Sequence, residues 1–352
     1  MIWIVLGGLT AWSTYARLHA ERPTGVSTHR PDMGRAARLI WIVVDGLRAD
    51  AASDPAVMPF LASRHSGIRG IASATHPAMT QTAVFAMGVG RAATLAESLE
   101  NFVPPEAPAE NLFAWLKGAG RTVHLLGDAT WTHRYGRWAT KTQPMPEGGH
   151  SDTHASDEAT MTAALESLQQ PPDVLVVHFV GPDHVAHADG VGASYHARLR
   201  EIDTDIQRLA SVPTGASILV VSDHGLDAKG SHGNGEPEAV EAPLVWWGPG
   251  VPTSPGVRIA QARLPVLIGE QLEVARPMQR RPPPRPTATI DLLVMTAVGG
   301  LGGWTGLLPV VLGGVTAGAA WLKWWPSHAF VYVLLLLGLA FYQRRAWVPL
   351  LG

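Results

Sequence analysis

Four short, mostly apolar runs, each followed closely by glycine or aspartate, constrain the fold of this chain more than any other feature. The runs cover residues 39–44, 122–126, 173–179 and 217–221. They lack the regular polar alternation of a half-exposed strand, so we expect strands that are buried on both faces of a parallel sheet. Helical patterns occur at residues 80–87, 111–119, 157–168 and 195–209. This alternation predicts an α/β domain with a doubly wound parallel sheet sandwiched by helices.

Polar side chains that suit metal binding follow three of these strands. Asp45 follows the first strand, Asp183 and His187 follow the third, and Asp223 and His224 follow the fourth. Ligands of doubly wound sheets bind beyond the carboxyl ends of the strands, so we expect these side chains to meet there. The four-residue spacing of Asp183 and His187 puts both on one face of a helical turn.

Two further candidates come from loops and helix ends. His232 lies in the glycine-rich segment 230–235, which can fold back over the strand ends. Thr80 precedes an apolar helix, so its hydroxyl is expected at a helix N-terminus, where backbone N–H groups and the helix dipole favour an anion. We take Thr80 as the candidate nucleophile, with Thr75 and Thr82 as the competing choices. The glycine after Asp45, Gly46, is expected to allow close backbone approach.

Composition excludes several classes of function. The formal net charge of the 352 residues is −2, so no polyanionic partner is implied and nucleic acid is not expected as a ligand. The chain contains no cysteine, which excludes disulfides, thiol catalysis and thiolate-bound zinc. The mixed aspartate and histidine set suits two divalent metal ions, zinc in the first place and manganese as the alternative.

The two ends of the chain have the composition of membrane segments. We predict an N-terminal signal anchor at residues 1–17 and a C-terminal transmembrane region of two or three helices at residues 288–345. Residues 292–322 carry no charged side chain. The remaining boundaries are predicted as a linker at 18–38, the catalytic domain at 39–270, and a Pro- and Arg-rich linker at 271–287.

The motifs together resemble those of the alkaline phosphatase superfamily, and most closely the GPI ethanolamine phosphate transferases. The matching segments are Val-Val-Asp-Gly-Leu-Arg at 43–48, Gly-Asp-Ala-Thr-Trp at 127–131, His-Phe-Val-Gly at 178–181 and Ser-Asp-His-Gly-Leu at 222–226. The resemblance extends over about residues 39–249. One departure is Ala129, which stands where the family has a second aspartate, and another is a membrane part far smaller than that of the family.

The resemblance implies an alkaline-phosphatase-like fold and a distribution of ligands over two metals. Asp45, Thr80, Asp223 and His224 would hold one metal and the nucleophile. The other metal would be held by Asp183, His187 and His232.

The resemblance also implies a reaction and a place for it. Thr80 would take phosphoethanolamine, or a similar head group, from a phospholipid such as phosphatidylethanolamine, and pass it to a glycan or lipid hydroxyl through a phospho-threonine intermediate. The expected location is a membrane, with the catalytic domain on the extracytoplasmic side, in the periplasm or the ER lumen. The alternative is a phosphodiesterase or nucleotide-pyrophosphatase-like hydrolase of the same superfamily, with water as the acceptor.

Overall fold

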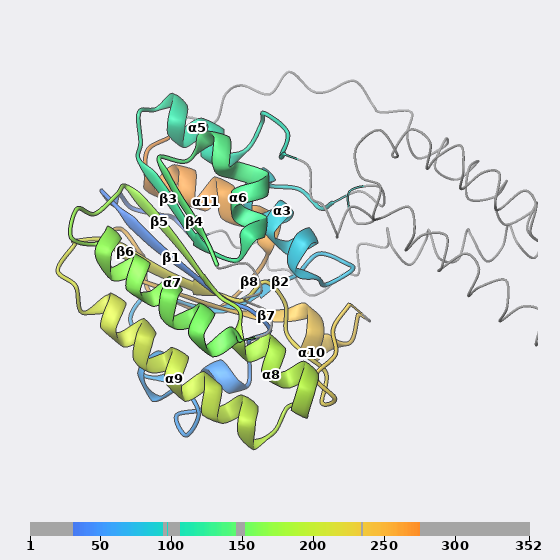
Figure 1. Cartoon of the computed structure of the whole chain (residues 1–352). Helices are drawn as coiled ribbons and strands as arrows, with labels where there is room; N and C mark the ends of the chain where they lie inside the picture. The colour runs from blue at the N-terminus through green and yellow to red at the C-terminus, as the bar shows by residue number, and fades with distance from the viewer. Residues whose placement is uncertain (1–30, 94–96, 98–105, 146–151, 234, 275–352) are drawn as a thin grey trace, which may run out of the picture. The chain divides into compact units, whose positions relative to one another are not determined.

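Strand β1 (Leu39–Val44) lies in the middle of an eight-stranded sheet that organises the domain (Figure 1). The computed structural model describes residues 31–93, 97, 106–145, 152–233 and 235–274. The strand order is β4-β3-β5-β1-β6-β7-β2-β8. The other strands are β2 (Ile68–Ser73), β3 (Val123–Gly127), β4 (Lys141–Pro144), β5 (Val174–Phe179), β6 (Ser217–Val221), β7 (Glu241–Trp247) and β8 (Ser254–Ala260).

The predicted sheet was wholly parallel, and this is wrong for one strand, β7. β7 pairs antiparallel with both β6 and β2, so the sheet is mixed. The physical reason is the connection from β6 to β7, which carries the short helix α10 (Pro237–Val240). This connection starts at the carboxyl end of β6 and does not cross over the sheet, so the chain re-enters from the same edge and must run in the opposite direction.

The four predicted strands are confirmed as β1, β3, β5 and β6, and they lie side by side in the parallel part of the sheet. Alternate side chains of β1 explain why its sequence is continuously apolar. Leu39, Trp41 and Val43 belong to one buried cluster, whereas Ile40 and Ile42 belong to the cluster on the opposite face. Both faces of β1 are therefore removed from water, which is the environment that such a run predicts.

Helices cover both faces of the sheet, as predicted. Helices α7, α8 and α9 lie on one face, and α3, α5, α6 and α11 lie on the other (Figure 1). Their bounds are α3 Thr80–Val89, α5 Leu112–Gly118, α6 Ala129–Tyr135, α7 Thr153–Ser167, α8 Gly181–Asp189, α9 Ala193–Ala210 and α11 Leu264–Gln271. Short elements complete the domain: α2 (Pro59–Ala62) and the 3-10 turns Ala51–Ser53, Gly136–Trp138 and Gln261–Arg263.

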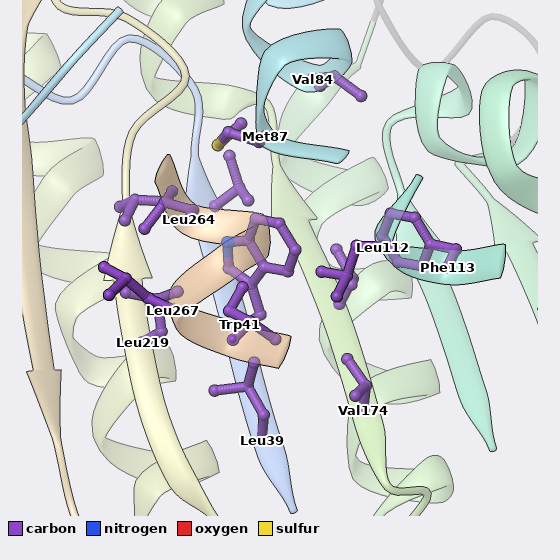
Figure 2. Packing of buried hydrophobic residues seen from close by; sticks show 14 of the residues in the cluster. Leu39, Trp41, Val84, Met87, Leu112, Phe113, Val174, Leu219, Leu264 and Leu267 are labelled. Atoms are coloured by element: carbon purple, nitrogen blue, oxygen red, sulfur yellow. The ribbon is translucent and has the colours of Figure 1, made fainter. Parts of the chain in front are cut away.

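Trp41 lies in the core on the face of the sheet that α3, α5, α6 and α11 cover. Figure 2 shows its indole between residues of α5 and α11, among them Leu112, Phe113 and Leu264. The rings of Trp41 and Trp131 meet edge to face with centroids 5.2 Å apart, and Trp41 is wholly buried. Aromatic side chains bury large apolar areas, so this group holds α5 and α6 against the sheet.

The predicted membrane segments at residues 1–17 and 288–345 lie outside the described residues. Within the described part of the chain, no helix combines the length and the apolar character needed to cross a bilayer.

Candidate metal centre

Four buried aspartates mark the carboxyl ends of four neighbouring parallel strands. In the spatial order β3, β5, β1 and β6, the strands lead to Asp128, Asp183, Asp45 and Asp223. Their exposed fractions are 8%, 7%, 5% and 0%. Parallel strands end at one edge of the sheet, so the topology gathers four carboxylates in a region that water hardly reaches.

Two groups of side chains in the described residues could each hold a metal ion. Asp45, Asp223 and His224 form one group, and Asp183, His224 and His232 form the other. Within each group, one ligand atom from every residue lies within 4.8 Å of the others. His224 belongs to both groups, whereas the sequence had assigned it to a single metal.

His224 presents a ring nitrogen to the centre of the cluster. Its Nε2 lies 3.4 Å from Oδ1 of Asp45, 3.3 Å from Oδ2 of Asp223 and 3.4 Å from the hydroxyl oxygen of Thr80. Its Nδ1 lies 3.1 Å from the carbonyl oxygen of Gly225. A carbonyl oxygen can only accept, so Nδ1 carries a proton, and in the neutral imidazole Nε2 keeps a free lone pair. That tautomer is the one a metal ligand requires.

His232 has the same tautomer for the same reason. Its Nδ1 lies 3.0 Å from the carbonyl oxygen of Ala78, and its Nε2 lies 3.8 Å from Oδ1 of Asp183. His187 completes this side of the cluster, with its Nε2 3.1 Å from Nε2 of His232 and 3.2 Å from Oδ2 of Asp183. The His187 side chain is 46% exposed, so this side of the cluster faces solvent.

Of the three threonines considered as nucleophile, Thr80 has its hydroxyl beside a histidine of the cluster, His224. It is the first residue of α3, in agreement with the predicted helix N-terminus. The hydroxyl of Thr82 is buried and donates to the carbonyl oxygens of Pro77 (2.6 Å) and Met79 (2.8 Å). The hydroxyl of Thr75 donates to the carbonyl oxygen of Thr82 at 3.3 Å. Both alternatives are thus engaged with backbone, which favours Thr80.

Gly46 is needed where β1 passes the cluster, as its position after Asp45 predicts. Its φ is +67°, a backbone conformation that residues other than glycine rarely adopt. An added Cβ would lie 3.0 Å from Oδ1 of Asp183. Its N–H donates to Oδ1 of Asp223 at 3.3 Å, and its carbonyl oxygen accepts from the Tyr195 hydroxyl at 2.9 Å. Any other residue here would press its Cβ against the Asp183 side chain and against Leu226.

Two buried residues to which the sequence analysis gave no role contact the ligand-bearing segments. Gln261 is wholly buried, and its Nε2 donates to the carbonyl oxygens of Ser222 (2.8 Å) and Asp223 (2.7 Å). No sequence signal marks this glutamine. His178, inside strand β5, places its Nε2 3.6 Å from Oδ2 of Asp45. The sequence feature that could have indicated a role for His178 is a histidine within an otherwise apolar strand.

The N-terminus of α8, which carries Asp183 and His187, is also fixed by a buried carboxylate. Asp157 accepts from the N–H groups of Val180 at 2.8 Å and Gly181 at 3.0 Å. The Arg198 guanidinium pairs with the same carboxylate at 2.5 Å. The carboxylate thus satisfies two N–H groups that a helix N-terminus leaves free.

Charge is unevenly distributed within the cluster. Burial, followed by the nearby carboxylates of Asp223, Asp183 and Asp128, raises the pKa of Asp45 well above its usual range. Burial alone would also raise the pKa of Asp183, but the bond from His187 and the neighbouring histidines outweigh it and lower that pKa. The ionised form of Asp45 is therefore disfavoured until a positive charge enters the cluster.

The cluster contains unsatisfied atoms that suit a cation. Asp45 Oδ1, Asp183 Oδ1 and Asp223 Oδ2 are buried and have no hydrogen-bond partner in the described structure. Buried carboxylate oxygens without partners are costly, and divalent cations bound in the two groups would satisfy them. Carboxylate oxygen together with imidazole nitrogen is a donor set that such cations bind. The residues present therefore fit a divalent metal centre.

Comparison with protein families agrees with this geometry. Residues 141–265 match the model of the metalloenzyme superfamily. The chain carries an alkaline-phosphatase-like metalloenzyme domain. The matched segment contains five of the predicted site residues, while Asp45 and Thr80 precede it. Those five are Asp183, His187, Asp223, His224 and His232.

Among curated proteins, the chain is similar to GPI ethanolamine phosphate transferases. It is 27% identical over 238 residues to the human GPI ethanolamine phosphate transferase 3, catalytic subunit, covering 61% of this chain and 22% of that protein. It is 27% identical over 237 residues to GPI ethanolamine phosphate transferase 2 of Yarrowia lipolytica, covering 64% of this chain and 27% of that protein. The match thus spans about a quarter of the length of these relatives.

Solved structures confirm the fold of the metalloenzyme domain. A 2-O GAG sulfatase matches with a TM-score of 0.57 and 14% identity, covering 72% of this chain and 74% of that chain. The murine ectonucleotide pyrophosphatase/phosphodiesterase 5 matches with a TM-score of 0.55 and 12% identity, covering 69% of this chain and 96% of that chain.

Proposed function

We propose that this chain transfers phosphoethanolamine, or a similar head group, from a phospholipid to a glycan or lipid hydroxyl, with Thr80 as the nucleophile. The observation that carries the proposal is the position of Thr80. Its hydroxyl begins helix α3 and lies 3.4 Å from Nε2 of His224, beside the buried carboxylates. The similarity to GPI ethanolamine phosphate transferases supports the choice of head group.

In this proposal the ligands of one divalent ion are Asp45, Asp223 and His224, and those of a second are Asp183, His187 and His232. Zinc is the expected ion, and manganese is the alternative. When bound there, such ions supply positive charge for the phosphate oxygens and for the ionised hydroxyl.

In this proposal, residues of the chain position the substrate phosphate and provide the nucleophile. The first-turn N–H groups of α3 point out of the helix beside Thr80, so they can donate to phosphate oxygens. Oγ1 of Thr80 loses its proton and forms a bond to phosphorus while the bond from phosphorus to the diacylglycerol oxygen breaks, and the released alcohol takes up a proton. An acceptor hydroxyl then loses its proton and attacks the same phosphorus. The bond from phosphorus to Oγ1 of Thr80 breaks, and Oγ1 takes up a proton again. Two in-line displacements give retention of configuration at phosphorus.

A membrane location belongs to the same proposal. The uncharged segment 292–322 and the apolar N-terminal end support it. The domain is placed on the extracytoplasmic side, as the resemblance implies. Because the chain has no cysteine, a single Glu158→Cys variant tests this directly. The Glu158 side chain is 71% exposed, and a membrane-impermeant maleimide should label the variant in intact cells or sealed luminal-side-out vesicles. Labelling that requires detergent would contradict the proposed side.

The proposed chemistry is tested by trapping the covalent intermediate. Full-length protein is incubated with zinc and with phosphatidylethanolamine that carries a phosphorus-32 label, quenched early and digested. We expect label on the peptide that contains Thr80 and none in the Thr80→Ala variant. Label that persists in Thr80→Ala would refute the nucleophile. Free labelled phosphoethanolamine that forms in the presence of alcohol acceptors, with no transfer product, would favour the hydrolase instead.

A further inference from the structure

A buried tryptophan fixes the protonation pattern of the fourth histidine near the cluster. The indole Nε1–H of Trp131 donates to Nδ1 of His178 at 2.9 Å, and both side chains are wholly buried. An indole nitrogen can only donate, so Nδ1 of His178 must accept. The imidazole is therefore neutral with its proton on Nε2. This is the opposite tautomer to that of His224 and His232, whose Nδ1 atoms face carbonyl oxygens.

The proton of His178 points at a carboxylate of the cluster. Its Nε2 lies 3.6 Å from Oδ2 of Asp45 and has no hydrogen-bond partner among the described residues. A shift of about 0.6 Å would bring the two atoms to an ordinary N–H···O separation of about 3.0 Å. The other oxygen of Asp45, Oδ1, lies 3.4 Å from Nε2 of His224. The two oxygens of Asp45 thus face two different kinds of nitrogen, one with a proton and one with a lone pair.

We propose that Trp131 and His178 form a positioning pair for Asp45, in which the indole N–H sets the His178 tautomer and the imidazole N–H orients the Asp45 carboxylate toward the metal. The inference rests on the metal centre of the proposed function. His178 is not itself a ligand, because its Nδ1 is taken by Trp131 and its Nε2 carries the proton. Hydrogen-bonding partners of metal ligands commonly change metal affinity by about 10–100-fold.

The chain offers a matched control for the tryptophan. Trp41 is buried in the same core cluster as Trp131, and the two rings meet edge to face. The indole N–H of Trp41 has no hydrogen-bond partner in the described structure. Trp41→Phe and Trp131→Phe therefore remove the same volume from one core, but only Trp131→Phe removes a donor to His178.

The experiment measures zinc affinity of the full-length protein by competition with a chromogenic chelator. We expect Trp131→Phe to weaken binding by about 10-fold or more and Trp41→Phe to leave it within about 2-fold. His178→Gln keeps an N–H group near the position of Nε2, so it should bind zinc more tightly than His178→Leu. Thermal unfolding of each metal-free variant shows whether it is folded.

A second measurement reads the tautomer without any metal. Long-range proton–nitrogen spectra of histidine-labelled, zinc-free protein should show His178 as the Nε2–H form, and Trp131→Phe should make it a mixture. Equal zinc affinity in Trp131→Phe and Trp41→Phe, or an Nδ1–H form of His178 in the wild type, would overturn this inference alone. Wild-type protein that binds no divalent cation would overturn the proposed metal centre together with it.

Discussion

The hydroxyl oxygen of Thr80 lies 3.4 Å from Nε2 of His224, across the space between the first turn of α3 and the end of β6. Thr80 begins a helix that covers one face of the sheet, and His224 lies in the loop that follows strand β6. The packing of α3 on the sheet therefore sets the distance between the candidate nucleophile and the candidate ligands. Small rigid-body changes of that helix would alter catalysis before they altered metal binding.

Thr80→Ala should separate these two properties. Without the hydroxyl, the transfer rate should fall by about 10³-fold or more, because no covalent intermediate can form. Zinc affinity should stay within a few-fold of the wild type, since Asp45, Asp223 and His224 remain. Thr80→Ser should keep measurable transfer. The two quantities are the steady-state rate with phosphatidylethanolamine and the zinc content of purified protein.

Thr82→Val is the matched control for Thr80→Ala. It removes a hydroxyl two residues away that bonds only to backbone carbonyl oxygens of Pro77 and Met79. We expect a stability loss of about 1 kcal/mol and a retained covalent intermediate. Loss of the intermediate in Thr82→Val, with full activity in Thr80→Ala, would move the nucleophile to Thr82.

Asp45→Asn should change the pH dependence of the metal-free protein. Burial and the carboxylates of Asp223, Asp183 and Asp128 raise the pKa of Asp45 above its ordinary value of 3.8. The folded state therefore holds this proton more tightly than the unfolded state. The stability from Asp45 is fully present below about pH 4 and is lost as the pH rises through the raised pKa. Between about pH 4 and the raised pKa, the unfolded state releases this proton more readily than the folded state, so the metal-free fold becomes less stable as the pH rises.

The measurement for Asp45→Asn is thermal unfolding in a chelator between about pH 4 and pH 8. The variant should become more stable relative to the wild type as pH rises, by at most about 1.4 kcal/mol for each pH unit. After zinc is added the order should reverse, because the wild type gains more binding energy than a variant that lacks one carboxylate ligand. A stability difference that does not change with pH would show that Asp45 is not strained by its neighbours.

Much of this site was predictable because strand ends are visible in the sequence. The apolar runs placed Asp45 and Asp223 at the ends of β1 and β6, and parallel pairing then brings them together whatever the details of packing. The four-residue spacing of Asp183 and His187 places both on α8, which the structure confirms. These inferences need only local periodicity and the rule that parallel strands share an edge.

The parts that were not predictable depend on contacts between distant segments. The antiparallel direction of β7 follows from the path of a loop, which has no periodic signal. In the sequence, nothing distinguishes Asp157 from the other residues of its helical segment. In the structure it is buried and caps the helix that carries Asp183. The tautomer of His178 depends on Trp131, which lies 47 residues earlier in the chain. Burial and partner choice of this kind are tertiary properties, so sequence patterns do not encode them visibly.

Gly46→Ala should damage the metal centre beyond its backbone strain. Gly46 and Gly215 share a φ of +67°, but an added Cβ meets Asp183 within 3.0 Å at Gly46 and nothing within 4 Å at Gly215. Both variants should lose about 1–2 kcal/mol of stability from the left-handed backbone. Only Gly46→Ala should also weaken zinc binding, by about 10-fold or more if displacement of the carboxylate resembles loss of its supporting partner. Equal zinc affinity in the two variants would contradict this reading.

Asp157→Ala should loosen the helix that carries Asp183 and His187. The substitution leaves the N–H groups of Val180 and Gly181 without their acceptor and leaves the Arg198 guanidinium beside a cavity. Breaking a buried pair by removal of one partner costs about 3 kcal/mol or more, and the remaining contact of Arg198 with Glu201 reduces this somewhat. Asp205→Ala breaks a more exposed pair with Arg208 on α9, the helix that also carries Arg198, and should cost less than about 1 kcal/mol. Urea unfolding measures both costs, and zinc titration should show weaker binding in Asp157→Ala alone. Similar unfolding free energies for the two variants would mean that Asp157 does not hold the N-terminus of α8.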